Sequence, residues 1–425
     1  MKVLVVGSGG REHVLVWKLK QSARVKEIFC APGNGGIAKD AQCVDIASDD
    51  VQGLCDFAVK NKIGLTIVGP EGPLVKGIVD EFQRKNLKIF GPSQKAAQLE
   101  GSKVFAKEFM RRHNIPTADF ESFDNINKAK AYVERKKFPI VIKADGLAAG
   151  KGVVICKDLQ EAHAALDKMM SEKIFNTAGE NVVIEECLEG EEASILAVSD
   201  GEKFVVLESS QDHKRIFDGD MGANTGGMGA YSPAPVVTKG LMMNITEDII
   251  EPTIHGMRQE GMPFTGVLYV GVMATKEGPK VLEYNVRFGD PETQVVLPRL
   301  KTDLVDLCLA SCKGKLAGMQ LEWSSRPCVC VVMSARGYPG SYEKGKTIYG
   351  LDDASKEKDV FVFHAGTKNQ ENKIVTSGGR VLGVTGLGKD IEKAIENAYN
   401  GIEKISFDGC FFRRDIGAKA LRRLR

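Results

Sequence analysis

The sequence has almost no excess of charge of either sign. Its 425 residues include 58 Lys and Arg against 56 Asp and Glu, which leaves a formal net charge of +2. A general nucleic-acid or polyanion binder needs a strong basic excess, so this balance argues against that class and leaves only a local basic pocket open. We therefore expect a small molecule as the partner and no nucleic acid.

Paired cysteines and long apolar runs are missing as well. The ten cysteines are scattered without a CxxC pair, and the close pair Cys328 and Cys330 lacks the further ligands of a tetrahedral metal site. No apolar run approaches the roughly 20 residues that span a bilayer, and a strand pattern begins at once without a charged-then-apolar leader. These absences predict free thiols in a cytoplasmic protein without membrane contact.

The residues that are present suffice for several cores. Hydrophobic residues make up 43% of the chain and charged residues 27%, and a chain of this length is expected to form two to four domains. There is no fixed-period repeat and no low-complexity linker. We predict three domains, at residues 1–102, 103–325 and 326–425.

Hydrophobic patterning indicates a fold class for each domain. The first alternates apolar strands with helices, which predicts a parallel α/β sheet covered on both faces. The second and the smaller third domain read as α+β structure with antiparallel strands. The expected strands are 2–6, 27–30, 65–69, 87–91, 138–144, 181–188, 192–199, 203–210, 266–275, 279–288, 328–335, 361–366, 380–386 and 410–417. The expected helices are 11–21, 74–85, 102–114, 158–171 and 389–403.

A first glycine loop, GSGGREH, follows the first strand. The third glycine of the dinucleotide pattern G-x-G-x-x-G is replaced by Glu12, and Ala31-Pro32-Gly33-Asn34 after the second strand offers no carboxylate for a ribose 2′-hydroxyl. An NAD site is therefore disfavoured. Backbone N–H groups at the start of a helix can still bind a single phosphate, and a tight turn without a ligand is the alternative.

A second glycine loop lies in VIKADGLAAGKGVVI, residues 141–155. It is not a P-loop, because three residues instead of four separate Gly146 from Gly150, and Gly152 occupies the Ser/Thr position. A loop that carries Lys151 and follows Lys143 can nevertheless close over phosphates as a lid. A plain hairpin turn with surface lysines is the alternative.

The strand pattern VLEYNVRFGDPE, residues 281–292, ends in an unusual set of polar residues. Alternation along a strand places Glu283, Asn285 and Arg287 on one face. One carboxylate and one amide oxygen suit Mg²⁺, whose octahedron is completed by phosphate oxygens and water. The alternative is an edge strand with polar residues facing water, but the dense charge beside Gly and Pro favours an anion-binding turn.

The stretches RFGDPETQ (287–294) and SSQDHKRIFDGDMGANTGGMGAYSPAP (209–235) resemble motifs of the glycinamide ribonucleotide synthetase family, ATP-grasp enzymes of purine biosynthesis also called phosphoribosylamine–glycine ligases. The similarity extends over the whole chain, through GSGGREH, GPEGPL (69–74), IKADGLAAGKGV, VVIEECLEGEE and GGRVLGV (378–384). Other ATP-grasp enzymes share the lid and the metal strand but not the run from Gln211 to Gly229.

The resemblance implies a central ATP-grasp domain with a mobile lid subdomain at about residues 122–190. It implies that Glu283 and Asn285 bind Mg²⁺ or Mn²⁺, and that Arg287 and Lys143 are the catalytic cations. The ATP-binding residues would be Lys103, Lys143, Gly150, Lys151, Gly152, Glu185, Glu186, Leu188 and Glu192.

The implied reaction joins glycine to 5-phosphoribosylamine through glycyl phosphate, with release of ADP and phosphate. Catalysis would depend on positioning and on cations, without a Ser or Cys nucleophile or a His base. We therefore expect a structural or binding role for His213. The first glycine loop would help to hold the ribosyl 5-phosphate. The substrate-binding residues would be Gly9, Gly10, Asp212, Lys214, Asn224, Thr225, Gly226, Gly227 and Asp290.

Other functions stay open at this level. Another carboxylate-activating ATP-grasp ligase or a carboxylase of purine metabolism would use the same cations. A non-catalytic ATP-binding regulator could lose Glu283, Asn285 or Arg287, yet all three are present. We expect a monomer or a weak homodimer.

Overall fold

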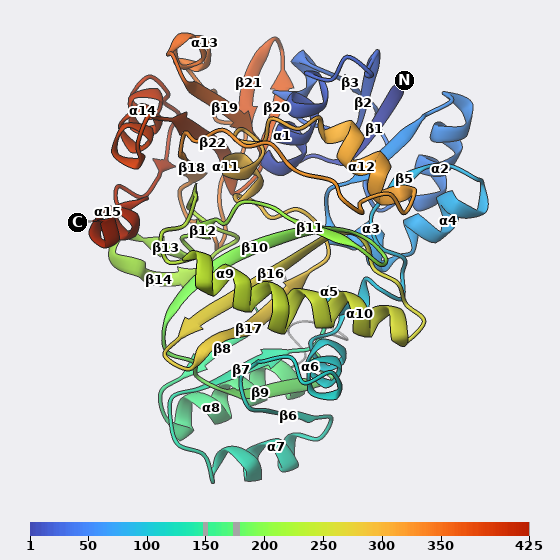
Figure 1. Cartoon of the computed structure of the whole chain (residues 1–425). Coiled ribbons are helices and arrows are strands. Elements are labelled where there is room, and N and C mark those ends of the chain that lie inside the picture. The colour runs from blue at the N-terminus through green and yellow to red at the C-terminus, as the bar shows by residue number, and fades with distance from the viewer. Residues whose placement is uncertain (148–151, 173–178, 425) are drawn as a thin grey trace.

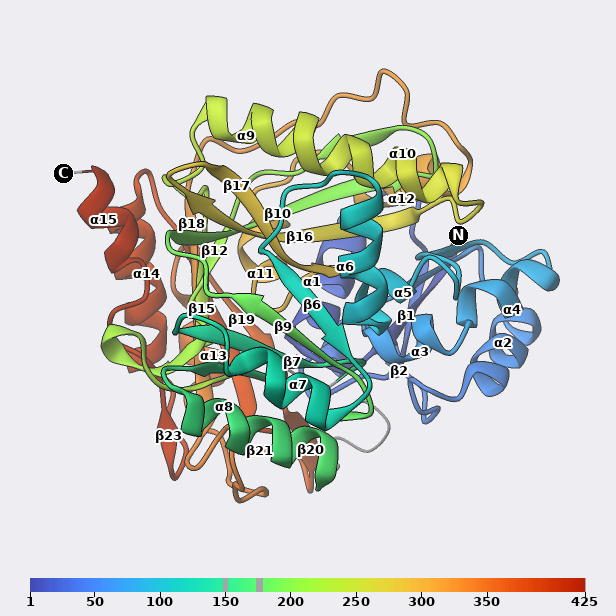
Figure 2. The same cartoon turned by 90° about the horizontal axis from the view of Figure 1, so that it is seen from below.

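The structure is a computed structural model that describes residues 1–147, 152–172 and 179–424. Figure 1 shows a central sheet with the N-terminal sheet to one side, the C-terminal sheet to the other and a small sheet below. Figure 2, seen from below, shows the N-terminal and C-terminal parts at opposite ends of the molecule with the small sheet between them. This arrangement confirms the predicted mixture of a parallel α/β domain and α+β domains.

The N-terminal sheet is parallel throughout, in the order β3-β2-β1-β4-β5. Its strands are β1 (Lys2–Gly7), β2 (Glu27–Pro32), β3 (Gln42–Cys43), β4 (Leu65–Val68) and β5 (Ile89–Phe90). Its helices are α1 (Gly10–Leu19), α2 (Val51–Lys60), α3 (Glu71–Val75) and α4 (Ile78–Arg84). The single helix expected at 74–85 is wrong, because Gly77 takes a left-handed conformation with φ of 84° and separates α3 from α4. The sequence patterns also missed β3 and α2.

The central sheet is antiparallel, in the order β11-β10-β16-β17. Its strands are β10 (Glu191–Asp200), β11 (Phe204–Val206), β16 (Thr265–Thr275) and β17 (Gly278–Asn285). Helices α9 (Lys239–Ile245) and α10 (Glu251–Gln259) form one long helical segment across it through a π-helical turn, Thr246–Ile250 (Figure 1). The strand expected at 203–210 is shorter than predicted, since β11 covers 204–206 and Ser210 pairs with Ser194 of β10 in an isolated bridge.

The small sheet has the order β6-β9-β7-β8 and a separate hydrophobic core. Its strands are β6 (Phe120–Phe123), β7 (Ile140–Ala144), β8 (Val153–Cys156) and β9 (Val182–Glu186). Helices α7 (Ile126–Val133) and α8 (Leu159–Leu166) cover it, and α8 continues into a π-helical turn, Asp167–Ser171. Two helices lead into the small sheet, α5 (Gln98–Gly101) and α6 (Lys103–Arg112). The Ser102 hydroxyl caps the start of α6, where it accepts from Phe105 N at 3.0 Å.

The C-terminal sheet has the order β12-β15-β18-β22-β19, and β23 also pairs with β18. Its strands are β12 (Gln211–Asp212), β15 (Gly229–Ser232), β18 (Cys328–Ala335), β19 (Val360–His364), β22 (Arg380–Leu387) and β23 (Cys410–Phe411). The strand expected at 410–417 is therefore wrong beyond its first two residues. Because β12 and β15 belong to this sheet, the segment between Gln211 and Ser232 is held against the C-terminal part of the chain.

Shorter elements complete the molecule. Hairpins are formed by β13 (Arg215–Phe217) with β14 (Met221–Asn224) and by β20 (Thr367–Gln370) with β21 (Lys373–Thr376). The remaining helices are α11 (Thr293–Val296), α12 (Leu304–Cys312), α13 (Leu351–Lys356), α14 (Ile391–Glu403) and α15 (Ala418–Leu424). Within the described ranges, no helix is long and apolar enough to cross a membrane.

Candidate functional site

A cavity of about 1030 Å³ lies where the four large sheets meet. Each part of the chain contributes a charged side chain to its wall: Arg11 from the N-terminal domain, Lys143 from the small sheet, Glu283 from the central sheet and Arg380 from the C-terminal sheet. Most residues that the sequence singled out line this cavity. They are Lys103, Lys143, Gly152, Glu185, Glu186, Leu188, Glu192, Asp212, Lys214, Asn224, Thr225, Gly226, Glu283, Asn285, Arg287 and Asp290. Gly150 and Lys151 lie outside the described residues.

The end of β17 borders the cavity from Leu282 to Asn285. Glu283 and Asn285 line it, whereas the hydroxyl of the intervening Tyr284 is buried and lies 2.7 Å from the Thr253 hydroxyl. The carboxylate of Glu283 lies 3.6 Å from Lys214 Nζ. Burial opposes ionisation of Glu283, but the surrounding cations, with Lys214 foremost, hold its pKa below the ordinary value. An ionised carboxylate and an amide oxygen thus share one face of the strand.

Lys214 is the cation at the centre of an acidic group. Its ammonium lies 2.8 Å from the Glu192 carboxylate as well as near Glu283. Burial disfavours its charged form, yet these two carboxylates raise its pKa well above the ordinary value. Burial raises the pKa of the neighbouring Asp212 to about 8 against the opposing effect of Lys214. The two carboxylates therefore keep Lys214 charged, and burial makes the carboxyl group of Asp212 reluctant to ionise.

The guanidinium of Arg287 is held by four acceptors. Its Nε donates to Glu71 at 3.0 Å, its Nη2 donates to Glu100 and to Asn285 Oδ1, both at 2.9 Å, and its Nη1 donates to the Phe288 carbonyl at 3.2 Å. Burial raises the pKa of Glu100 to about 7 against the effect of Arg287. For Glu71 burial acts in the same direction, but Arg287 and Arg11 prevail and lower its pKa to about 2. Arg287 is therefore a cation held in a fixed position, and the amide oxygen of Asn285 is one of its acceptors.

Two lysines share one buried carboxylate at the side of the cavity nearest the small sheet. Glu185 Oε2 lies 2.9 Å from Lys143 Nζ and 3.1 Å from Lys107 Nζ. Lys143 also donates to the Leu282 carbonyl at 3.0 Å, and Lys107 to the Thr117 hydroxyl at 2.7 Å. Burial lowers the pKa of Lys107 to about 8 although Glu185 opposes the shift. In the described part of the chain, Glu185 Oε1 has no hydrogen-bond partner.

Lys107 lines the cavity but was missed from the sequence. A signal was available, because Lys103 and Lys107 are four residues apart and therefore lie on one face of helix α6. Lys103 itself donates to the Gly146 carbonyl at 2.8 Å, at the start of the second glycine loop. At the end of β9, Glu186 accepts from Lys280 at 3.5 Å and from Asp119 N at 3.1 Å.

The loop of residues 224–227 is tied to the C-terminal sheet. Thr225 Oγ1 donates to the Lys214 carbonyl at 2.8 Å, and Gly226 N donates to the Tyr338 hydroxyl at 3.0 Å. Gly227 has φ of 110°, and a Cβ there would lie 2.4 Å from Pro291 Cδ, so only glycine fits. The loop thereby presents Asn224, Thr225 and Gly226 to the cavity.

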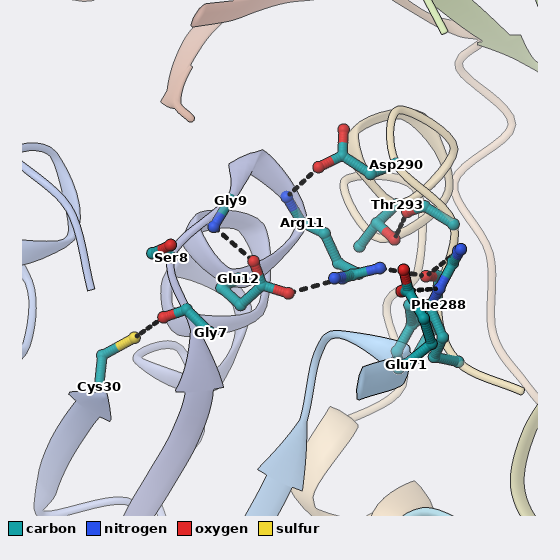
Figure 3. A network of polar contacts seen from close by, with 12 residues as sticks. Gly7, Ser8, Gly9, Arg11, Glu12, Cys30, Glu71, Phe288, Asp290 and Thr293 are labelled. Carbon is teal, nitrogen blue, oxygen red and sulfur yellow. Dashed lines mark hydrogen bonds and ion pairs between the residues drawn. The ribbon is translucent and has the colours of Figure 1, made fainter. Parts of the chain in front are cut away.

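Figure 3 shows that the first glycine loop is capped by the chain's own carboxylates. The Glu12 carboxylate accepts from Gly9 N at 2.5 Å and from Arg11 Nε at 2.6 Å, and Asp290 Oδ2 accepts from Arg11 N at 3.2 Å. Gly10 is buried, and a Cβ there would lie 2.7 Å from the side-chain nitrogen of Gln294. Carboxylates thus already stand where the glycine pattern predicted a phosphate.

A second cavity of about 340 Å³ adjoins the large one. Asp290, Tyr338 and Arg380 line both. The rest of its wall comes from the N-terminal and C-terminal domains. These residues are Ser8, Gly9, Gly33, Asn34, Ala365, Gly366, Thr367, Ser377 and Gly378.

His213 is a buried structural residue in this molecule. Its ring packs 5.8 Å from that of Tyr231, and neither ring nitrogen has a hydrogen-bond partner among the described residues. Burial lowers its pKa to about 3, with a further contribution from Arg413 and Lys419. A neutral ring enclosed in this way is unsuited to the role of catalytic base that the sequence had also disfavoured.

Comparisons with known proteins agree over the whole chain. Family models described as phosphoribosylglycinamide synthetase match at residues 1–100 (N domain), 101–293 (ATP-grasp domain) and 328–419 (C domain). A phosphoribosylamine–glycine ligase of Caldanaerobacter subterraneus is 52% identical over 418 residues, covering 98% of this chain and all of that protein. The Escherichia coli K12 protein of the same name is 53% identical over 429 residues, covering 100% of this chain and 99% of that protein.

Solved structures show the same fold. The crystal structure of phosphoribosylamine–glycine ligase from Thermotoga maritima has a TM-score of 0.86 at 35% identity, covering 98% of this chain and all of that one. The biotin carboxylase domain of 2-oxoglutarate carboxylase from Hydrogenobacter thermophilus, solved with MgADP and bicarbonate, has a TM-score of 0.73 at 16% identity, covering 97% and 91% of the two chains. The second likeness concerns the fold alone.

Proposed function

The chain belongs to the phosphoribosylglycinamide synthetase family, and from that membership we propose how its own residues perform the reaction. The activity is that of a phosphoribosylamine–glycine ligase, an ATP-dependent ligase of purine biosynthesis. One observation supports the assignment of residues more than any other. Cations from the N-terminal domain, the small sheet and the C-terminal sheet line a single cavity together with Glu283 and Asn285 of the central sheet, and this cavity is large enough for a nucleotide and two small substrates.

ATP lies between the small sheet and the central sheet, with its triphosphate toward Lys103 and Lys143. The end of β9, at Glu185, Glu186 and Leu188, holds the adenine edge, and Glu192 holds the ribose. Gly150, Lys151 and Gly152 cover the phosphates from the lid. The support for this placement is that the described members of this set line one wall of the cavity.

Glu283 and Asn285 are the residues that hold Mg²⁺ or Mn²⁺. The donor set fits such an ion, because an ionised carboxylate and an amide oxygen are hard ligands and leave positions for phosphate oxygens and water. When bound, the ion neutralises charge on the β- and γ-phosphates. Lys214, which lies 3.6 Å from Glu283, would then face a phosphate or the glycine carboxylate.

In the first step the glycine carboxylate attacks the γ-phosphorus, the bond to the bridging oxygen of ADP breaks, and glycyl phosphate forms. Lys143 and Arg287 face the negative charge of the transferring group. Glu185 holds the first cation, and Glu71 and Glu100 hold the second, so neither has to reorganise during the reaction. Such preorganisation lowers the barrier without a protein nucleophile.

In the second step the amine of 5-phosphoribosylamine attacks the carbonyl carbon of glycyl phosphate and gives up a proton as phosphate leaves. The substrate pocket is shaped by Asp212, Lys214 and the loop of residues 224–227, that is Asn224, Thr225, Gly226 and Gly227. Asp290, with Gly9 and Gly10 beside it, adjoins the ribosyl end. The support is that the C-terminal sheet holds this loop in place through Tyr338 and Arg380.

The decisive experiment measures ADP release with glycine and freshly generated 5-phosphoribosylamine, each omitted in turn. Release that requires both substrates supports the proposal. Release driven by bicarbonate in place of either substrate would contradict it and indicate a carboxylase. The domain limits at 102 and 325, the lid at about 122–190, the cytoplasmic location and the monomeric or weakly dimeric state are predictions that sedimentation, limited proteolysis and fractionation can check.

A further inference from the structure

Carboxylates of the chain already accept from two of the backbone donors that the glycine loop was expected to offer a phosphate. Glu12 already accepts from Gly9 N at 2.5 Å, and Asp290 accepts from Arg11 N at 3.2 Å (Figure 3). A phosphate placed at this helix end would meet the negative charge of these two carboxylates. Any phosphate in this region therefore needs a positive charge from elsewhere in the chain.

Arg380, the first residue of β22, supplies that charge. Its Nη1 donates to the carbonyl oxygens of Gly226 at 2.6 Å, Gly227 at 3.3 Å and Asp290 at 2.7 Å. Among residues 1–147, 152–172 and 179–424, no acceptor lies within hydrogen-bonding distance of its Nε or Nη2. These three carbonyls fix the plane of the guanidinium, and its remaining donors stay available at the wall that both cavities share.

Hydroxyl groups complete the small cavity. Ser377 has no hydrogen-bond partner for its hydroxyl within the described ranges, while the hydroxyl of the buried Thr367 lies 3.1 Å from His364 Nδ1. Ser8 and Tyr338 add two further hydroxyls to the wall. One arginine surrounded by hydroxyls is a donor set that suits a phosphate monoester.

The only carboxylate in this lining is already matched by donors. Asp290 Oδ1 accepts from Gln294 Nε2 at 2.8 Å and lies 3.3 Å from Arg380 Nη1, and its Oδ2 accepts from Arg11 N. It stands at the boundary of the two cavities, where its remaining lone pairs can accept from the hydroxyls of a sugar.

The relation of the two cavities suits an elongated ligand. Asp290, Tyr338 and Arg380 belong to both walls, so the two cavities are neighbours and a ligand that extends along these residues contacts both. In 5-phosphoribosylamine the phosphate on C5 and the amine on C1 lie at opposite ends of the sugar ring. A phosphate in the small cavity therefore directs the amine toward the large cavity, where the acyl phosphate forms.

We propose that the small cavity is the binding site for the 5-phosphate of the amine substrate, with Arg380 as its counter-charge and Thr367 and Ser377 as hydroxyl donors. This inference rests on the proposed function for the identity of the sugar phosphate. It assigns discrimination between phosphorylated and unphosphorylated ribosylamine to the C-terminal domain. The first glycine loop then forms part of the wall, and its N–H groups are not the anchor.

The test is calorimetric binding of ribose 5-phosphate, ribose and inorganic phosphate to the full chain. Wild type should bind ribose 5-phosphate more tightly than either of the other probes. Arg380→Met should weaken ribose 5-phosphate by about tenfold or more, and Ser377→Ala by about threefold. Arg422→Met, a change of an exposed arginine on α15, is the matched control and should leave the affinity unchanged.

Arg380 also donates to the carbonyls of Gly226 and Gly227, so Arg380→Met could weaken ligand binding by disturbing this loop. Ser377→Ala leaves these contacts in place and therefore tests direct binding of the phosphate. In turnover, both variants should raise the KM for phosphoribosylamine and leave the KM for ATP unchanged. The inference is overturned if wild type does not prefer ribose 5-phosphate to ribose and inorganic phosphate, or if both variants bind it as wild type does. If the wild type shows no glycine-dependent ADP release, the proposed function is overturned instead. The two outcomes are distinguishable because the binding experiment contains no ATP or glycine.

Discussion

Arg11 and Arg287 donate to the same oxygen atom, the carbonyl of Phe288, from Nη1 atoms at 3.1 and 3.2 Å. Two guanidinium groups so close together would repel each other without compensation. Glu12 lies 2.6 Å from Arg11 Nε, and Glu71 and Glu100 lie 3.0 and 2.9 Å from Arg287. The contact joins the N-terminal domain to the segment that follows β17, so the position of Arg287 depends on both.

We predict that Arg287→Lys lowers kcat by about 10²-fold, the size expected when one preorganised donor to a transition-state charge is lost. Lysine keeps the charge, but a single ammonium cannot replace the planar fork that meets Glu71, Glu100 and Asn285 together. Steady-state ADP release checks the prediction. The control is Arg258→Lys, whose exposed arginine pairs with Glu202. A kcat within twofold of wild type would remove Arg287 from the catalytic set.

We predict that Glu283→Ala weakens MgATP binding by more than about tenfold, since loss of a metal ligand costs at least as much as loss of the contacts that support one. Chelation of the metal by EDTA should weaken ATP binding to the wild type in the same way. The fold should persist because Lys214 keeps its 2.8 Å pair with Glu192. Calorimetry with MgATP is the measurement, and Glu277→Ala, at an exposed carboxylate of the preceding turn, is the control. Normal MgATP affinity in Glu283→Ala would contradict the metal site.

We predict that Lys143→Met lowers the rate of the chemical step by about 10²-fold or more while stability changes little. The variant removes a cation from the cavity wall but leaves Lys107 as a partner for the buried Glu185. Single-turnover formation of ADP measures the step, and thermal unfolding measures the stability. Lys157→Met, at an exposed position of the same small domain, should match wild type in both. An unchanged single-turnover rate in Lys143→Met would argue against its role.

We predict that the free energy of unfolding falls as the pH drops from about 6.5 toward 3, in part because of His213. Burial lowers the pKa of its ring to about 3 in the folded chain, whereas an unfolded histidine titrates near 6.5. Between these values the unfolded chain binds a proton that the folded chain does not, so acid favours unfolding. His213→Gln should make this slope shallower by up to about 1.4 kcal/mol per pH unit. Denaturant unfolding at several pH values measures the slope.

The control for this pH dependence is His255→Gln, because His255 is exposed. It should leave the slope as in wild type. His13 and His364, which are also buried with pKa values lowered by burial to about 4 and about 3, keep part of the slope in both variants. An identical slope in wild type and His213→Gln would show that His213 is protonated or exposed in the folded chain.

Some of the site could be predicted because it depends on local geometry alone. A strand places alternate residues on one face, so the spacing of Glu283, Asn285 and Arg287 was sufficient to predict that they reach one cavity. Tyr284 between them also lines this cavity, although its hydroxyl is bonded to Thr253. The same reasoning applied to a helix would have found Lys107 from Lys103. The fold class followed equally from the order of apolar runs, whereas short elements such as β3 and the break at Gly77 gave too weak a pattern.

The sequence by itself determined which residues each strand and helix could present together, because backbone periodicity acts within a few residues. Only the tertiary structure decided which elements face each other. It brought Arg380 to the loop of residues 224–227, and it placed Asp290 against the N–H of Arg11, 279 positions away. It also set carboxylates against two backbone donors of the first glycine loop and brought the guanidinium of Arg380 to the same cavity from the C-terminal domain. Contacts of this range depend on how whole sheets pack, and no local pattern of residues encodes that packing.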